Sequence, residues 1–342
     1  MSDVVVFRYD MSSQIGLGHF YRCKALSESL ENLGFTSIHA VGSESRAYVP
    51  VDDVKFLVLK SSKIEEELGE IRGFCKRLPR IYIRDSYSLS SCWDSAVLKG
   101  DGASLVSIED SFACSVVKTL IVNPGIMPTS HEAISNCRRL YGPRFAILRS
   151  SFHKNRGRAL QAIKDVNRPI SKILICMGGS DPACHTESIA RALSEEKMTN
   201  ERSYIIVVGA GVSPARYDNL KKIASTFAGS VELVRDTRNL PDIMLQADFA
   251  IGSFGGMAWE RMCLGIPSLG VRQADNQVLI ERTFNQLGAG LSVSIREVLP
   301  ALVELIIDRA ALKSMREQAL KAFHLVDGSG ADRIAKEIQR VS

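Results

Sequence analysis

Two stretches near the start decide the fold class: VVVFRYD at residues 4–10 and GLGHFYRCKALSESLENL at residues 16–33. The first is a short apolar run of the kind that forms a buried parallel strand. The second opens with two glycines and then carries apolar residues at helical spacing. Gly34 follows, where a helix commonly ends in a left-handed residue. Together they predict a strand, a glycine loop and a helix, the start of a βαβ unit.

The same alternation continues along the chain and predicts an α/β protein with parallel sheets. A length of 342 residues suits two domains. The pattern loosens before Pro169 and then restarts, so we expect two Rossmann-like, doubly wound domains facing each other across a ligand cleft at the carboxyl ends of their strands. The expected boundaries are a first domain over 1–150, a linker over 151–170, a second domain over 171–325, and a C-terminal helix within 326–342 that packs back on the first domain.

Composition excludes several classes of protein. Lys and Arg exceed Asp and Glu by 43 − 38 = +5, and this excess is spread along the chain, so no nucleic-acid partner is expected. The apolar runs are too short to span a bilayer, and no signal peptide precedes the first strand, so we expect a cytoplasmic protein without stable membrane insertion. The eight cysteines form no CxxC pair, and the histidines show no metal-ligand spacing. We therefore predict no metal site. No cofactor is expected either.

The first candidate site lies around the first glycine loop. Asp10 ends the strand, Gly16 and Gly18 allow close approach of a ligand to the helix N-terminus, and His19 opens the helix. A positive helix end disfavours imidazolium, so His19 suits a general base, with Asp10 orienting the ring or a water. The alternative is a histidine that merely caps the helix. Further along, Tyr87 follows a strand end, where it either reaches a substrate or simply packs.

The second half repeats strand-to-helix junctions that suit a diphosphate. Gly179 and Ser180 lie in one loop, and Gly255, Gly256 and Met257 lie in another, where bare amides at a helix start favour an anion. The Walker pattern is absent, so an NTPase is rejected. The alternative for the first loop is a tight turn with an Asp-Pro helix start.

Three further polar residues lie at such junctions in the second half. Glu260 suits ribose hydroxyls, because a carboxylate accepts two hydrogen bonds, or it serves the helix dipole. Asn276 and Gln277 offer amides to a sugar, or they cap a helix.

Taken together, these motifs resemble a known family. Its segments here are, in order, Arg8-Tyr9-Asp10, Ile15-Gly16-Leu17-Gly18-His19 with Arg22, Asp85-Ser86-Tyr87 with Leu89 and Trp93, Tyr141-Gly142-Pro143 with Leu148, Arg149 and Phe152, Gly178-Gly179-Ser180-Asp181-Pro182, Trp259-Glu260 with Gly265-Ile266-Pro267, Asn276-Gln277, and Asp327-Gly328 with Arg333. The chain is similar to the hydrolases of pseudaminic acid biosynthesis that release UDP from UDP-2,4-diacetamido-2,4,6-trideoxy-β-L-altropyranose. These are similar in turn to MurG-type glycosyltransferases of the GT-B fold.

The resemblance implies a GT-B fold, a UDP-sugar as partner, and no metal requirement. It implies that His19 is the base for water, that Tyr87 assists in the sugar pocket, and that the second domain holds UDP. We also expect Arg8 to contact substrate. Two departures stand out. Phe254 replaces a usual glycine and would narrow the site, and Gly256-Met257-Ala258 replace small hydroxyl residues that contact phosphate. Ser86 also departs from the usual residue after Asp85.

The expected reaction is a single displacement by water at the anomeric carbon, with inversion. Helix N-termini in the second domain would stabilise the UDP leaving group. Two alternatives stay open: a GT-B glycosyltransferase that uses an acceptor hydroxyl on the same scaffold, and a non-catalytic UDP-sugar-binding protein. Sugar release without an acceptor separates them. Protein partners and oligomeric state are not readable from the sequence.

Overall fold

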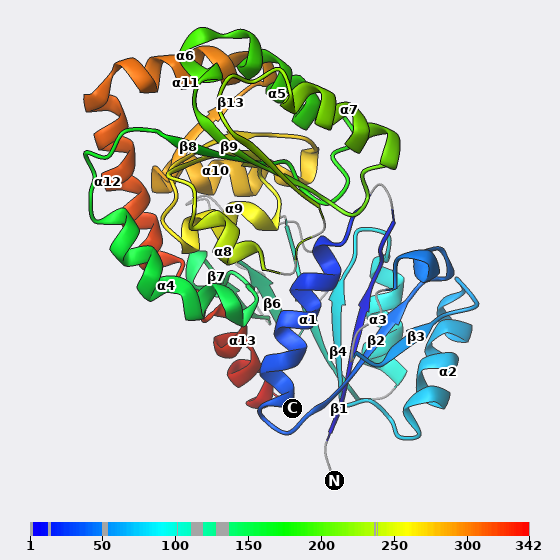
Figure 1. The fold of residues 1–342 in the computed structure, drawn as a ribbon. Coiled ribbons are helices and arrows are strands. Elements are labelled where there is room, and N and C mark those ends of the chain that lie inside the picture. Colours follow the sequence, from blue (N-terminus) through cyan, green and yellow to red (C-terminus); the bar gives the residue numbers. More distant parts are fainter. Residues whose placement is uncertain are drawn as a thin grey trace. The chain divides into compact units, whose positions relative to one another are not determined.

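A computed structural model describes residues 3–12, 15–49, 54–100, 102–110, 119–127, 137–235, 237 and 239–341. The chain divides into two compact units (Figure 1): unit 1 holds Met1–Arg149 with Gly328–Ser342, and unit 2 holds Ser150–Asp327. Within the described residues, no helix is both long and apolar enough to cross a membrane.

Unit 1 is built on a seven-stranded sheet in which every described pair is parallel. Across the sheet its strands are β3 (Phe56–Val58), β2 (Thr36–Val41), β1 (Val4–Tyr9), β4 (Ile81–Asp85), β5 (Ser104–Ile108), β6 (Leu120–Asn123) and β7 (Arg138–Tyr141). Its helices are α1 (Gly18–Glu31), η1 (Ser43–Tyr48), α2 (Ile64–Cys75), α3 (Ser91–Gly100), η2 (Pro143–Phe145) and α13 (Gly330–Gln339). The strand order reverses between β1 and β4, so their carboxyl ends form the crevice where such sheets bind ligands.

The two faces of this sheet carry separate apolar cores. One core joins Val5, Phe7 and Tyr9 of β1 to α1 and α13, and the other joins Val4 and Val6 to α2 and α3. This division follows from the pleat, because successive side chains of a strand point to opposite faces. α13 lies beside α1 (Figure 1).

Unit 2 repeats the plan with six parallel strands. Across the sheet they are β10 (Val231–Arg235), β9 (Ser203–Val208), β8 (Lys172–Cys176), β11 (Phe249–Ser253), β12 (Ser268–Val271) and β13 (Gly290–Val293). Its helices are α4 (Ser150–Ile163), α5 (His185–Glu195), α6 (Lys197–Asn200), α7 (Pro214–Ala224), α8 (Leu240–Met244), α9 (Gly256–Cys263), η3 (Asp275–Gln277), α10 (Val278–Leu287), η4 (Ile295–Glu297), α11 (Val298–Ile307) and α12 (Arg309–Leu325). The order reverses between β8 and β11, which makes their ends the corresponding crevice.

The stretch expected as a linker, 151–170, differs from the prediction. Most of it is α4, which belongs to unit 2 and buries Phe152 and Ala159. One of its basic residues, Arg156, has a structural role. The Arg156 guanidinium lies 3.6 Å from the centroid of the Phe323 ring and donates to the carbonyls of Cys263 and Val326 at 2.8 and 2.9 Å. These carbonyls end α9 and α12, where a positive charge is favourable.

Candidate functional site

The first candidate site lies at the carboxyl ends of β1 and β4 in unit 1. Gly16 adopts φ +76° and closes the β1–α1 loop with a 2.7 Å bond from its amide to the Ser12 carbonyl. This left-handed turn suits glycine. Gly18 begins α1, so His19 occupies the first helical turn, and its side chain is almost wholly buried at 6 % exposure.

His19 is held by the carboxylate of Asp85, a residue for which the sequence predicted no role. Its Nδ1 lies 2.7 Å from Oδ1 of Asp85, the last residue of β4. An ionised carboxylate only accepts hydrogen bonds, so Nδ1 carries the proton and the lone pair is on Nε2. Within the part of the chain that the structure describes, nothing hydrogen-bonds Nε2. A neutral ring fixed in this tautomer can accept a proton at Nε2.

Arg22, one turn further along α1, keeps Asp85 ionised. Its Nε donates to Oδ2 of Asp85 at 2.7 Å, and its Nη1 donates to Oδ1 of Asp110 at 2.9 Å. Burial by itself raises the pKa of the Asp85 carboxyl, but the charge of Arg22 and the hydrogen bonds from His19 and Arg22 outweigh it, and the net pKa is lowered. Asp85 therefore stays an acceptor for the imidazole across the physiological pH range.

Asp10 does not orient the His19 ring, which corrects the first of the two roles predicted for it. Asp85 pairs with Tyr9 across the sheet, so both point to the α1 face, whereas Arg8 and Asp10 point to the opposite face. There the Asp10 carboxylate accepts the hydroxyls of Ser86 and Ser88 at 2.9 and 2.7 Å. These serines flank Tyr87, so Asp10 positions the loop that presents this tyrosine.

Tyr87 lies against the imidazole of His19. Its ring meets His19 edge-on at 4.9 Å between centroids and 74° between planes. It is half exposed, at 53 %, and its hydroxyl donates to Asp110, which Arg22 also binds. Asp110 is a second site residue that sequence reasoning missed.

Arg8, expected to contact substrate, is buried in an ion network instead. Its Nε donates to Oε1 of Glu67 at 2.9 Å, and its Nη1 donates to Oδ1 of Asp10 at 2.5 Å. The indole of Trp93 donates to the same Glu67 oxygen at 2.7 Å. The guanidinium is thus committed within unit 1, and we assign Arg8 a positioning role through Asp10.

Acidification should destabilise unit 1 through these carboxylates. Burial alone raises the pKa of Asp10, but Arg8, Ser88 and Ser86 lower it overall, and the pKa of Asp85 is lowered too. Their stabilising contribution is present above the unfolded-state value of about 3.9 and is lost as the pH falls through the lower folded-state values. We expect the thermal midpoint to fall with pH below about 5, and to fall less in Asp85→Asn. Equal pH slopes in the parent and the variant would contradict this.

The second candidate site lies at the carboxyl ends of β8 and β11 in unit 2. Gly178 adopts φ +110°, and Gly179 follows it. A side chain on Gly209 would place its Cβ 2.2 Å from the Gly179 carbonyl oxygen, so the β9–α7 loop packs directly on this turn. Asp181 then caps α5 by accepting the amides of His185 and Thr186 at 3.0 and 2.9 Å. The Asp181-Pro182 pair thus forms a turn just before α5, which itself begins at His185, and Gly179 and Ser180 precede that turn.

The neighbouring loop, after β11, leads into α9, whose first turn begins with glycines. Gly255 is the N-cap of α9, and Gly256 and Met257 are its first residues. Gly255 has no side chain with which to cap this helix end. Such an end presents amide donors and the positive end of the helix dipole to an anion. Glu260 lies on the same helix and is buried.

Phe254 does not narrow this site, contrary to the expectation. Its ring is fully buried, packs edge-on against Phe284 at 5.2 Å between centroids, and fills the space above Gly270 of β12. A Cβ on Gly270 would lie 2.1 Å from the Phe254 ring. The phenylalanine is thus matched by a glycine on the next strand, and it belongs to the core.

Phe254→Ala should leave a cavity between α10 and β12. We expect it to lower the free energy of unfolding of unit 2 by about 3–5 kcal/mol, measured by urea denaturation. The control in the same unit is Ile307→Ala, because Ile307 is 65 % exposed on α11, and its loss should cost less than about 1 kcal/mol. Equal losses for the two variants would contradict the core assignment.

Asn276 and Gln277 lie in η3, at the third junction of unit 2. Gln277 Oε1 accepts the backbone amide of Gln273 at 2.9 Å, and Gln273 Nε2 donates to Asp181 Oδ1 at 2.9 Å. This chain of bonds ties η3 to the β8–α5 loop. Gln277 therefore has a structural bond through its oxygen, while Asn276 is exposed.

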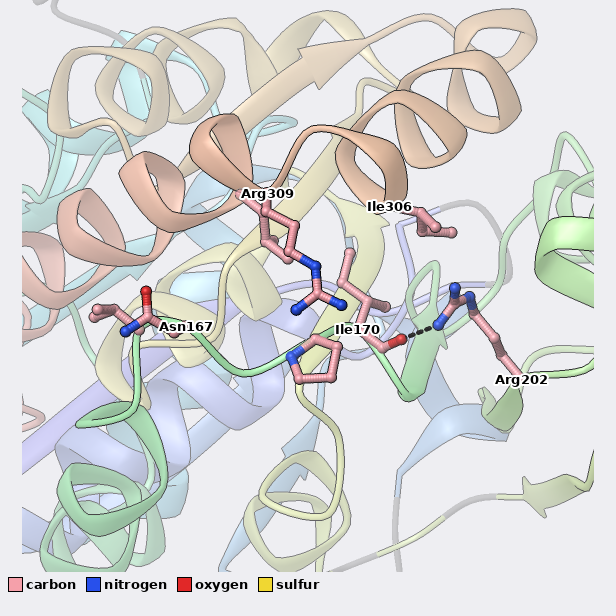
Figure 2. Close-up of a pocket in the computed structure, with 8 residues that line it drawn as sticks. Asn167, Ile170, Arg202, Ile306 and Arg309 are labelled. Carbon is pink, nitrogen blue, oxygen red and sulfur yellow. Dashed lines mark hydrogen bonds between the residues drawn. The ribbon is translucent and has the colours of Figure 1, made fainter.

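Two further features bear on alternative sites. A small pocket in unit 2 is lined by Val166, Asn167, Pro169, Ile170, Arg202, Ile306, Arg309 and Leu312 (Figure 2), none of which is a predicted site residue. Across the residues that the structure places, no group of three or more His, Cys, Asp or Glu side chains is arranged to hold a metal ion. The described cysteines are free thiols, and Cys114 lies outside the described residues.

Comparison with known proteins gives distant relatives over most of the chain. No family model matches. The chain is 22 % identical over 331 residues to the spore coat polysaccharide biosynthesis protein SpsG of Bacillus subtilis (strain 168), covering 95 % of this chain and 94 % of that one. It is 24 % identical over 266 residues to a UDP-2,4-diacetamido-2,4,6-trideoxy-β-L-altropyranose hydrolase of Campylobacter jejuni, covering 76 % of this chain and 88 % of the hydrolase.

Among solved structures, MurG of Acinetobacter baumannii superposes with a TM-score of 0.68 at 14 % identity, covering 99 % of both chains. At this identity the likeness concerns the fold. Two parallel doubly wound sheets, of seven and six strands, agree with it. The chain therefore has the two-domain α/β architecture of the GT-B superfamily, and it resembles, at low identity, the altropyranose hydrolase named above.

Proposed function

We propose that this protein is a nucleotide-sugar hydrolase that releases UDP from a UDP-linked diacetamido-trideoxy hexose by attack of water at the anomeric carbon. The observation that carries the proposal is the buried His19–Asp85 pair, joined at 2.7 Å, which leaves Nε2 as the proton acceptor at the crevice of unit 1. The resemblance to the Campylobacter hydrolase supports the substrate class.

In this proposal His19 removes a proton from water as the water attacks. The imidazolium that forms is stabilised by Asp85, whose ionised state Arg22 maintains. Tyr87 packs on the ring and limits its orientation. A single attack inverts the configuration at the anomeric carbon.

The leaving group is assigned to unit 2. As the sugar–oxygen bond breaks, charge develops on the diphosphate, and amides at the start of α9 and in the turn of Gly179 and Ser180 would stabilise it. Backbone amides thus replace the hydroxyl side chains that Gly256-Met257-Ala258 lack.

The test is incubation with a panel of UDP-sugars, without metal or acceptor, while UDP and free sugar are followed by NMR. The proposal predicts release of both in equal amounts from a diacetamido-trideoxy substrate. Turnover that requires an added hydroxyl acceptor would indicate a glycosyltransferase instead. Binding of UDP without turnover, and without an effect of His19 substitution, would indicate a non-catalytic binding protein.

A further inference from the structure

Unit 2 contains a buried positive charge at the ends of β8 and β11 that has no role in the proposed reaction. Arg261 lies on α9 and is 1 % exposed. Its Nη2 donates to the Ser253 carbonyl at 2.9 Å and its Nε donates to Ser268 Oγ at 3.2 Å. Its Nη1 is buried and has no hydrogen-bond partner among the described residues.

The position of this guanidinium is set by the strands that end at the site. A Cβ on Gly252 would lie 2.5 Å from Arg261 Nη1 and 2.7 Å from the Cys176 carbonyl oxygen. Gly252 and Cys176 are partners in the β8–β11 register, next to the two glycine loops. The glycine at 252 therefore makes room for the charge directly beneath the proposed diphosphate site.

A second observation points to a ligand at the same place. Ser253 ends β11 and is 3 % exposed. Its Oγ lies 3.7 Å from a Cβ built on Gly178 and 3.9 Å from one built on Gly255, so it sits between the two glycine loops. No hydrogen bond to this hydroxyl exists among the residues that the structure describes. A hydroxyl, bare amides and a buried cation thus converge there.

A buried cation without a counter-ion is costly, because burial removes its hydration. No carboxylate of the described chain lies within ion-pair distance of Arg261. The neighbouring Glu260 acts on it only at longer range, and burial outweighs that attraction. Burial lowers the pKa of this guanidinium to about 10, which still leaves it charged at neutral pH. The charge therefore lowers the stability of the ligand-free unit, and an anion bound at the loops would compensate it.

We propose that Arg261 is the internal counter-charge for the diphosphate of the bound nucleotide, an inference that rests on the proposed function. Arg261 attracts the diphosphate electrostatically without touching it, and it holds the Ser253 carbonyl in place. It is therefore a positioning residue. The Ser253 hydroxyl is the side-chain donor to the phosphate that positions 256–258 do not provide.

The test compares wild type with Arg261→Gln, whose amide retains a donor for the Ser253 carbonyl but carries no charge. The matched control is Arg316→Gln. Arg316 is also buried in unit 2, but it lies by Asp248, at the amino-terminal edge of β11. Affinities for uridine, UMP and UDP are measured by titration, and the thermal midpoint is measured without ligand.

We expect Arg261→Gln to bind UDP roughly 10- to 100-fold more weakly and UMP by a smaller factor, with uridine within about twofold, because the loss follows the ligand's charge. The ligand-free midpoint should be unchanged or higher, because an unpaired buried charge is removed. Arg316→Gln should bind UDP within about twofold of wild type.

Unchanged UDP affinity in Arg261→Gln would overturn the inference. An equal loss of affinity for uridine and UDP would overturn it too, because it would mean that Arg261 only supports the shape of the loop. If Arg261→Gln does not fold, Arg261→Met replaces it in the same series. A wild-type protein that binds neither UMP nor UDP would instead refute the proposed function.

Discussion

Replacing His19 by Asn lowers kcat for release of UDP by about 10²- to 10⁴-fold, because the amide cannot accept a proton from water at neutral pH. The affinity for UDP should stay within about twofold, since the nucleotide is assigned to unit 2. Single-turnover release of UDP, followed by ³¹P NMR, measures the first effect, and titration with UDP measures the second.

A matched control tests whether any change to a buried histidine has this effect. His39 is also buried in unit 1, where its Nδ1 meets the Tyr9 hydroxyl at 3.0 Å. His39→Asn should change stability and leave kcat within about threefold. Full turnover in His19→Asn would remove His19 from the chemistry.

The second large effect is expected from Asp85→Asn, with kcat lowered by about 10²- to 10⁴-fold. Arg22 donates to both Asp85 oxygens, from Nε to Oδ2 and from Nη2 to Oδ1, and the Cys23 thiol also donates to Oδ2. We expect the oxygen of the introduced amide to stay on the Oδ2 side, where both donors are fixed, and its NH₂ group to face His19, whose ring can change tautomer. The ring then accepts at Nδ1 and carries its proton on Nε2, which makes it unable to act as the base.

The tautomer itself is measurable. ¹⁵N chemical shifts of the His19 ring should report Nδ1–H in the parent and Nε2–H in Asp85→Asn. The control is Asp94→Asn, a buried aspartate of α3 that Arg84 binds at 2.7 Å, which should leave both the tautomer and kcat unchanged. A parent ring protonated on Nε2 would contradict the assigned base.

Hydrophobic periodicity was sufficient to predict most of the fold. The first strand, the glycine loop and the helix that His19 opens all lie where the alternation predicted them. The periodicity missed the edge strands β3, β7 and β13, which are short and only partly buried, so their apolar signal is weak. It also missed α4, because its basic residues are typical of a solvated linker. In the structure, one of them, Arg156, binds the ends of two helices.

The site was predicted less completely, because its pairs depend on registers between strands. Asp10 and Asp85 both follow or end strands that meet at one edge, but only the β1–β4 register and the pleat tell which of them faces α1. The role of Arg261 could not be predicted from the sequence for a similar reason. In the sequence it is a cation near a helix C-terminus, and only the structure shows that Gly252 leaves room for its guanidinium.

The central claim is that water, activated by His19, attacks the sugar carbon and leaves the nucleotide diphosphate intact. The direct measurement is turnover of the UDP-linked diacetamido-trideoxy hexose in ¹⁸O-labelled water, without metal or acceptor, with UDP analysed by ³¹P NMR and the sugar by ¹H NMR. The account predicts UDP free of ¹⁸O and a free sugar that first appears as the inverted anomer. Label in the released UDP, or first release of the retained anomer, would contradict it.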